Sequence, residues 1–268
     1  MDRDRTELEI LFRIAGRVHL AVRRALGQPQ RAEVVAMGAS GTPTERIDRL
    51  AEDEVRAVLE EEKVGWNLLS EEVGRVDRGG TRTLVLDPID GSHNALRGLP
   101  FATVSLAVGE DTLGSIGASV VHDLSTGATY WAAPGSGAFR DGRPLRTRPW
   151  EARRELFFLN LGRHATPRVV AWASRGRRIR SLGCASLEIL AVAQGSADAY
   201  LFENDVEARN LRVTDIAAAY RILREAGGGL SDLSGAPLEP MPLGLERRTS
   251  VFAWADEKLR TAGPGSPT

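Results

Sequence analysis

The sequence contains 268 residues, of which 42% are hydrophobic and 26% are charged, and its formal net charge is −1. This length allows one large domain or two tightly joined halves and excludes a small module held together by disulfides. The near-neutral charge creates no global field that would attract nucleic acid, and the sequence has no run of about 18 apolar residues that would predict a membrane span.

The first predicted elements are two helices separated by a loop. Thr6 and Glu9 have the spacing of a capping box, and apolar residues then recur at helical intervals until Gly27. Residues 38–43 are predicted to form a flexible loop. Apolar residues at helical spacing predict a second amphipathic helix over residues 47–59.

A short strand followed by a turn carries the densest group of polar ligand atoms. Residues 82–86 are strand formers, and Pro88 biases Asp87 toward extended geometry, so the strand is expected to end at Asp87. The string Asp90-Gly91-Ser92 then has the turn and cap chemistry that begins a helix, whose free N–H groups favour an anion. This segment could bind a hard cation beside a phosphate, although Asp and Gly also fill ordinary turns.

The rest of the chain alternates between strands and helices. Strands over residues 101–108, 115–122, 128–132 and 138–145 predict an antiparallel meander, and a second α/β portion follows with strands at 156–161, 198–202 and 250–254 and helices at 185–193 and 215–226. We therefore expect an N-terminal α+β portion over residues 1–150, a C-terminal α/β portion over 151–262 and a disordered tail over 263–268. The basic residues 175–180 are interpreted as a solvated loop rather than an RNA site.

Three acidic blocks, residues 68–72, 86–92 and 213–228, together resemble the signature segments of the inositol monophosphatase family of Mg-dependent, lithium-sensitive phosphomonoesterases. The resemblance covers most of residues 6–255. Residues 41–48, 94–95 and 211–215 are most similar to the archaeal branch, which hydrolyses both inositol monophosphate and fructose 1,6-bisphosphate. The resemblance implies an α/β (α+β) fold, the five-layer αβαβα sandwich of the inositol monophosphatase and fructose-1,6-bisphosphatase (sugar phosphatase) fold.

The resemblance also implies a site for two or three metal ions. Glu71, Asp87 and the Ile89 carbonyl would hold one ion, and Asp87, Asp90 and Asp215 would hold a second. Four carboxylates cannot gather without cations, because each like pair at about 4 Å costs roughly 4 kcal/mol at an effective dielectric near 20. The ligand atoms are all oxygens, which favours Mg, with Mn as a substitute, over Zn.

The implied reaction is in-line attack by metal-activated water without a phosphoenzyme. Glu71 and the Ser92 hydroxyl would orient the water, and the N–H groups of Gly91 and Ser92 would hold phosphate oxygens. Thr44, Asp48 and Glu52 would form a mobile third-metal site that closes over the substrate. Asp48 and Glu52 lie four residues apart on one face of the predicted helix. The alternative is that they are exposed helix acids.

Substrate contacts are less specific in the sequence. Arg180, Arg209 and Arg212 could bind a second phosphate or sugar hydroxyls, since the Arg fork matches phosphate oxygens. Glu203, Asp205 or Glu207 could contact inositol. Each of these six residues could instead be a member of a surface ion pair. Glu72 is interpreted as an acid behind the ligands, and His93 as a residue of the pocket rim or the surface rather than a ligand.

The expected function is hydrolysis of a small phosphate ester in the cytoplasm, with neither a nucleic acid nor a membrane as partner. The single Cys184 is read as a packing residue, and it suits a reducing compartment. Two alternatives are a 3'-phosphoadenosine 5'-phosphate phosphatase and an RNA-associated regulatory protein on the same fold. A homodimer is expected, because the family usually pairs and the strands over residues 101–145 need cover on a second face.

Overall fold

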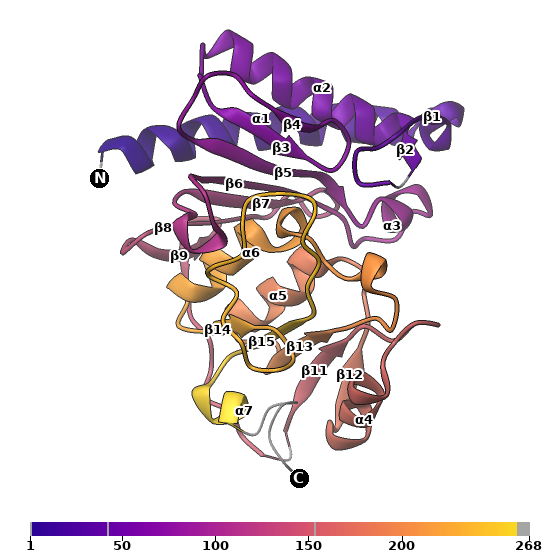
Figure 1. Ribbon diagram of the computed structural model, residues 1–268, viewed down its shortest axis with the longest axis vertical. Helices are drawn as coiled ribbons and strands as arrows, with labels where there is room; N and C mark the ends of the chain where they lie inside the picture. The colour runs from indigo at the N-terminus through magenta and orange to yellow at the C-terminus, as the bar shows by residue number, and fades with distance from the viewer. Residues whose placement is uncertain (1, 42, 153, 262–268) are drawn as a thin grey trace.

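The computed structural model describes residues 2–41, 43–152 and 154–261. Its elements form five stacked layers of helix, sheet, helix, sheet and helix (Figure 1), which confirms the predicted αβαβα sandwich. No helix within the described ranges is long and apolar enough to cross a membrane. The predicted tail over residues 263–268 lies outside the described residues.

The first layer consists of α1 (Asp2–Leu26) and α2 (Arg46–Glu61), each of which buries an apolar face on the sheet beneath. The predicted start of α1 at Thr6 is wrong. Ion pairs at helical spacing, Arg3 to Glu7 at 3.3 Å and Arg5 to Glu9 at 3.2 Å, extend the helix back to Asp2.

Between these helices the chain forms a short 3-10 helix, η1 (Pro29–Ala32), and a hairpin of β1 (Val34–Met37) and β2 (Pro43–Glu45). The predicted loop over residues 38–43 is therefore mainly the connection of this hairpin. Residue 42 lies outside the described residues.

The second layer is an eight-stranded sheet in the order β10-β9-β8-β7-β6-β5-β3-β4. Every neighbouring pair is antiparallel except β3 and β5. The antiparallel run from β5 to β10 confirms the predicted meander. The strands are β3 (Asn67–Ser70), β4 (Gly74–Val76), β5 (Thr83–Asp90), β6 (Thr103–Gly109), β7 (Ser119–Asp123), β8 (Thr129–Ala133), β9 (Gly137–Arg140) and β10 (Arg143–Leu145), with η2 (Leu113–Ser115) before β7.

Several strand boundaries in this sheet differ from the prediction, and two of the differences have a local cause. The single strand expected over residues 138–145 is a hairpin, because Asp141 and Gly142 have φ angles of 49° and 75°, as a two-residue turn requires. β5 continues beyond Asp87 to Asp90, where it still pairs with β6. Pro88 lies at an irregularity of this pairing, where its missing N–H is tolerated.

The remaining layers come from the second half of the chain. α5 (Ala185–Ala193) and α6 (Val213–Glu225) fill the middle, above a five-stranded sheet in the order β12-β11-β13-β15-β14. Its strands are β11 (Leu156–Leu159), β12 (Arg178–Arg180), β13 (Ala199–Phe202), β14 (Gly229–Ser231) and β15 (Val251–Trp254), and α4 (Pro167–Arg175) and α7 (Glu257–Thr261) cover the outer face. The basic residues 175–180 are thus not a loop, because they end α4 and form edge strand β12.

The sheet formed by the first half is covered on both faces by helices of the same chain. α1 contacts β6, β7 and β8 from one side, and α6 contacts β5 to β9 from the other. For β6, β7 and β8, the cover that supported the expected homodimer is therefore supplied by the chain itself.

Candidate metal-binding active site

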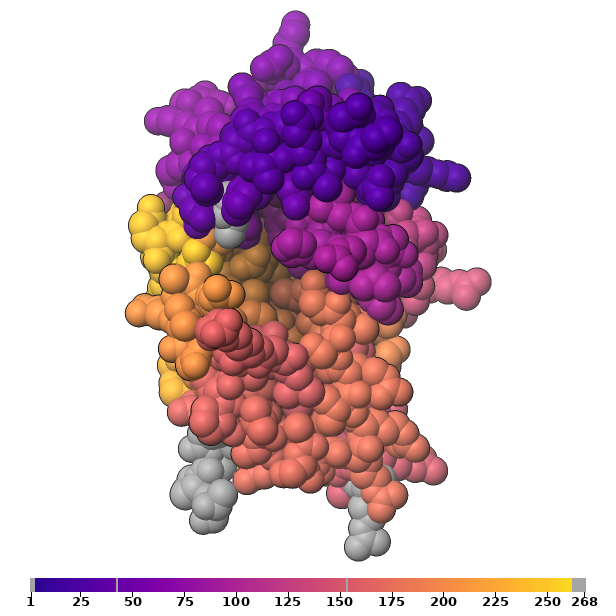
Figure 2. Space-filling view, turned by 90° about the vertical axis from the view of Figure 1, so that its right-hand side faces the viewer, coloured from indigo at the N-terminus to yellow at the C-terminus, as the bar shows by residue number. Residues whose placement is uncertain are grey.

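A cleft of about 390 Å³ lies where the N-terminal hairpin, the ends of β3 and β5 and the start of α6 meet. Figure 2 shows a hollow on this side of the molecule, between the indigo N-terminal segment, a magenta segment and the orange C-terminal half. The lining residues are Val34, Pro43, Glu45, Asp48, Glu71, Glu72, Asp87, Ile89, Asp90, Gly91, Ser92, His93 and Asp215.

Three carboxylates from different elements converge in this cleft. Glu71 follows β3, Asp87 lies in β5 and Asp215 lies in the first turn of α6, yet one oxygen from each falls within 4.8 Å of the others. Burial raises the pKa of Asp87 and Asp215 well above the ordinary value, and the adjacent Glu71 raises both further. A divalent cation would offset this cost, so the donor set fits an oxygen-ligated metal.

Asp90 lines the same cleft, but its carboxylate is also bound by the middle layer. Its oxygens accept hydrogen bonds from the backbone N–H of Ala185 at 3.2 Å and Ser186 at 2.6 Å, at the start of α5. Burial raises the pKa of Asp90, and the donors from Ser186, Cys184 and Ala185 oppose that shift. Cys184 is fully buried against Asp90, and burial raises its thiol pKa, as expected for a packing residue.

The turn after β5 brings its backbone close to the cleft. Gly91 has a φ of 85°, and a Cβ at this position would lie 2.4 Å from the Phe101 carbonyl, so only glycine fits. Ser92 begins α3 (Ser92–Leu96), and the Asp87 carboxylate accepts the Ile89 N–H at 3.1 Å. Gly91, Ser92 and the exposed His93 all line the cleft.

Asp48 and Glu52 of α2 are buried, so the alternative that these two are exposed helix acids is wrong. Asp48 is 5% exposed and Glu52 is 1% exposed. Burial, together with nearby Glu72, raises the pKa of Asp48 to about 8. Glu52 lies behind the cleft, where it accepts a hydrogen bond from the Ser70 hydroxyl at 2.6 Å, and the Thr44 hydroxyl donates to Glu72.

The predicted substrate arginines lie in different settings. Arg180 is on the edge strand β12 and Arg209 on the 3-10 helix η3 (Glu207–Arg209), and both are exposed and outside the cleft lining. Arg212 is 4% exposed, and its guanidinium lies 3.6 Å from Glu71.

The three acids considered for inositol also lie outside the lining. Glu203 accepts a hydrogen bond from Thr166 at 2.7 Å, and Asp205 lies 3.0 Å from His164, while Glu207 is exposed.

Two residues near the acids were missed by the sequence reasoning. The Thr214 hydroxyl donates to Glu71 at 2.8 Å, and its place directly before Asp215 was a usable signal. Arg248 reaches the carbonyl of Ser40, which is 208 residues away in sequence, and no local pattern could have indicated that contact.

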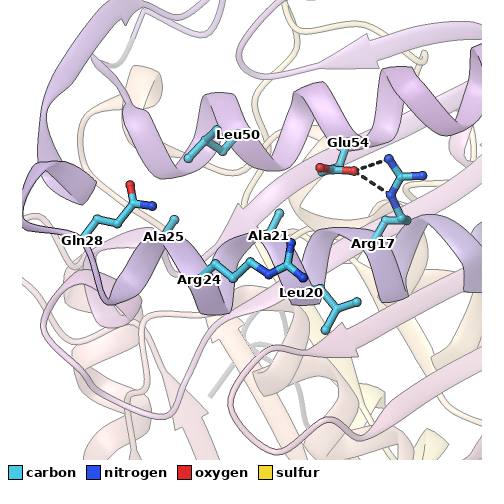
Figure 3. Close-up of a pocket in the computed structure, with 8 residues that line it drawn as sticks. All are labelled: Arg17, Leu20, Ala21, Arg24, Ala25, Gln28, Leu50 and Glu54. Atoms are coloured by element: carbon cyan, nitrogen blue, oxygen red, sulfur yellow. Dashed lines mark hydrogen bonds and ion pairs between the residues drawn. The ribbon is translucent and has the colours of Figure 1, made fainter.

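A second hollow, between α1 and α2, has a different character (Figure 3). Among its lining residues Glu54 is the only acid, and it is paired with Arg17 at 2.7 Å. This hollow therefore lacks the convergent carboxylates of the cleft.

Comparisons with known proteins agree with this geometry. The sequence model of the inositol monophosphatase family matches residues 4–259. The fructose-1,6-bisphosphatase/inositol-1-monophosphatase of Methanothermobacter thermautotrophicus is 35% identical, covering 93% of this chain and 92% of that protein. The bifunctional NADP phosphatase/NAD kinase of Methanocaldococcus jannaschii is 32% identical over 91% of this chain but 47% of that protein. A solved structure from Pyrococcus horikoshii, described as similar to inositol-1 monophosphatase, superposes with a TM-score of 0.84 at 27% identity and covers 98% of this chain and 99% of that one.

Proposed function

Because this chain belongs to the inositol monophosphatase family and is a metal-dependent phosphoric monoester hydrolase, we propose that it hydrolyses fructose 1,6-bisphosphate, inositol monophosphate or both, with Mg as the cofactor. The observation that carries this proposal is the convergence of Glu71, Asp87 and Asp215 within 4.8 Å in a cleft beside the Gly91-Ser92 turn. Relatives named for both activities support the choice of substrates.

The proposed metal ligands are those that the resemblance to the family implies, and all of them line the cleft. Glu71, Asp87 and the Ile89 carbonyl would hold one ion, and Asp87, Asp90 and Asp215 a second. The Asp90 oxygens retain lone pairs beyond those used by the N–H groups of α5, so they could serve both partners. When bound, Mg would neutralise the phosphate charge and lower the pKa of the attacking water, and Mn could replace it.

The chain's own groups would bind and orient the reactants. Glu71, steadied by the Thr214 hydroxyl, and the Ser92 hydroxyl would orient the attacking water. The backbone N–H groups of Gly91 and Ser92 would hold phosphate oxygens. Asp48, which lines the cleft, would complete a third cation position with Thr44, whose hydroxyl donates to the neighbouring Glu72, and Glu52 would support this position through Ser70.

A second phosphate would be bound outside the cleft. Arg180 and Arg209 are exposed, so their guanidinium groups are accessible to a phosphate at the far end of a longer substrate. A nucleotide substrate is the second candidate, because two relatives are named as NADP phosphatases.

A panel of substrates distinguishes these candidates. Phosphate release should be measured with Mg for fructose 1,6-bisphosphate, inositol 1-phosphate, NADP and 3'-phosphoadenosine 5'-phosphate. We expect kcat/KM for one of the first two to exceed that for either nucleotide by about tenfold or more. Preferential release from a nucleotide would overturn the sugar assignment while leaving the hydrolase intact.

We further propose that the protein acts in the cytoplasm as a homodimer. The single thiol, Cys184, is buried and free, which suits a reducing compartment. Exposed apolar side chains on β1, including Val34 at 58% and Met37 at 68% exposure, offer apolar surface that a second copy could cover.

A further inference from the structure

The segment 38–41, which follows β1, is docked directly onto the paired acids after β3. The backbone N–H of Ala39 donates to the Glu72 carbonyl, and that of Ser40 donates to the Glu71 carbonyl, both at 2.9 Å. β2 and α2, which carry Thr44 and Asp48, come shortly afterwards in the chain. The placement of this segment therefore affects where Thr44 and Asp48 lie relative to Glu71.

Two arginines from the second half of the chain bind this segment at one atom. The Ser40 carbonyl accepts hydrogen bonds from Nη2 of Arg212 and from Nη2 of Arg248, the latter at 3.5 Å. Arg248 also donates through Nη1 to the Asn210 carbonyl at 3.1 Å. Because these donors are anchored in a different part of the fold, they connect the hairpin to the opposite wall of the cleft.

A short stretch of main-chain pairing places the two arginines side by side. Leu211 donates to the Thr249 carbonyl at 3.1 Å, and Thr249 donates back to the Leu211 carbonyl at 2.8 Å. Arg212 and Arg248 flank this bridge, so both side chains leave from neighbouring strands of chain. Their convergence on Ser40 is therefore built into the backbone.

The local charges show why two guanidinium groups can share this position. Arg212 is almost fully buried, and two like charges at close range are unfavourable unless carboxylates compensate them. Nη1 of Arg212 lies 3.6 Å from Glu71. Burial and the neighbouring Arg212 lower the pKa of Arg248, and Asp215 and Glu71 oppose that shift. Nη2 of Arg212 is thus hydrogen-bonded to Ser40 and Nη1 is paired with Glu71, whereas the buried Nε has no hydrogen-bond partner.

We propose that Arg212 and Arg248 are positioning residues that clamp the Ser40 carbonyl and thereby hold Thr44 and Asp48 in register with Glu71. This role differs from the substrate contact that the sequence suggested for Arg212, because a guanidinium that is 4% exposed and bound to Ser40 is not presented to a substrate. The inference rests on the proposed metal site for its consequence, but the clamp itself can be tested without metal or activity.

Amide hydrogen exchange of the metal-free protein tests the clamp. Arg248→Met keeps the length of the side chain and removes its donors. We expect the amides of Ala39 and Ser40 to exchange about tenfold faster, since a hydrogen bond to a charged donor that fixes the segment is lost. The Thr249 amide, which reports the bridge beside Arg248, should keep its protection. Arg247→Met, at the exposed neighbouring position, is the matched control and should behave as the original protein does.

A second readout links the clamp to the cation site. The Mg concentration that gives half of the maximal thermal stabilisation should rise about threefold or more in Arg248→Met, while kcat at saturating Mg stays within about twofold. Arg212→Lys keeps the charge but loses the forked guanidinium. It should likewise speed amide exchange at Ala39 and Ser40 and raise the Mg concentration needed for half-maximal stabilisation.

Three outcomes separate the interpretations. Unchanged exchange at Ala39 and Ser40, with Thr249 still protected, would overturn the clamp. A raised KM for substrate with an unaltered Mg response and unaltered exchange would assign Arg248 to substrate binding instead. If the original protein shows no Mg response and no phosphatase activity, the proposed function fails, but the exchange experiment still decides whether the clamp exists.

Discussion

Asp90 shows, at the scale of one residue, why chemistry was easier to predict than geometry. Its place in the string Asp90-Gly91-Ser92 indicated a ligand, and the structure does place it in the cleft. Its hydrogen bonds to the N–H groups of Ala185 and Ser186 could not be predicted, because they join positions about 95 residues apart. The same limit applies to Arg248, whose neighbours in sequence do not include Ser40.

Replacing Asp215 by Asn separates catalysis from folding. A raised folded-state pKa means that the metal-free native protein binds protons that the unfolded chain has released, so its stability falls as pH rises above about 4. Asn is neutral without binding a proton, and it retains an acceptor for the Arg212 N–H. We expect the metal-free variant to be as stable as the original protein or more stable, on the order of 1 kcal/mol, in thermal melts at neutral pH.

The same substitution should abolish most activity. Loss of a ligand to the second metal should lower kcat by about a thousandfold, roughly 4 kcal/mol in the barrier, and the variant should gain less thermal stability from millimolar Mg. A variant that melts far below the original protein without metal would instead show that Asp215 mainly caps α6.

Elements were predicted well wherever their pattern was local and strongly periodic. The predicted helix over residues 185–193 has the bounds of α5, and its apolar character all round agrees with its place between two sheets. The hairpin at Asp141-Gly142 was missed although Asp-Gly is a turn signal, because the strand pattern continues on both sides. β12 and β14 were also missed, since three-residue strands carry too little periodicity to be recognised.

The contact between α1 and β7 should be sensitive to pH. Nε2 of His122 lies 3.1 Å from Nδ1 of His19, and Nδ1 of His122 lies 2.8 Å from the Thr129 hydroxyl. Burial lowers the pKa of His122, and the neighbouring His19 lowers it further, while Asp123 and Asp141 oppose the shift. The unfolded chain therefore binds a proton at His122 more readily than the folded protein does. The contribution of neutral His122 to the free energy of unfolding is complete above about pH 6.5 and is lost as pH falls.

Denaturant titrations at pH 7.5 and 5.5 test this contact. Between these two pH values, the free energy of unfolding of the original protein should fall by about 1 kcal/mol more than that of His19→Gln. This difference corresponds to one net hydrogen bond. An equal fall in the free energy of unfolding of the two proteins would show that the histidine pair does not make stability depend on pH.

At the scale of the whole molecule, the sandwich followed from three acidic blocks rather than from its individual elements. Those blocks identify the family, and the family has a known order of layers. That order could not be predicted from the pattern of any single strand or helix. The association of two such molecules is a separate matter, because the helices of one chain already cover both faces of the first sheet.

Light scattering at micromolar concentration tests the homodimer. A dimer mass is expected if β1 and its exposed apolar side chains are covered by a second copy, and Met37→Lys should then shift the protein toward monomer. A monomer mass for the original protein would contradict the proposal, whereas a dimer that is unaffected by Met37→Lys would place the interface elsewhere.

The irregular end of β5 decides on which side of the sheet its acids emerge. Asp87 pairs with Ser105 and Asp90 pairs with Thr103, so β5 uses three steps where β6 uses two. In an unbroken strand, residues three apart have opposite parity and point to opposite faces, and the extra residue cancels that parity. Both carboxylates can therefore line one cleft. Removing one residue between them would leave the two acids two apart, on one face of a regular strand, but it would also remove the irregularity in which the Ile89 carbonyl lies, whereas exchanging Ile89 for another apolar residue would keep that carbonyl in place.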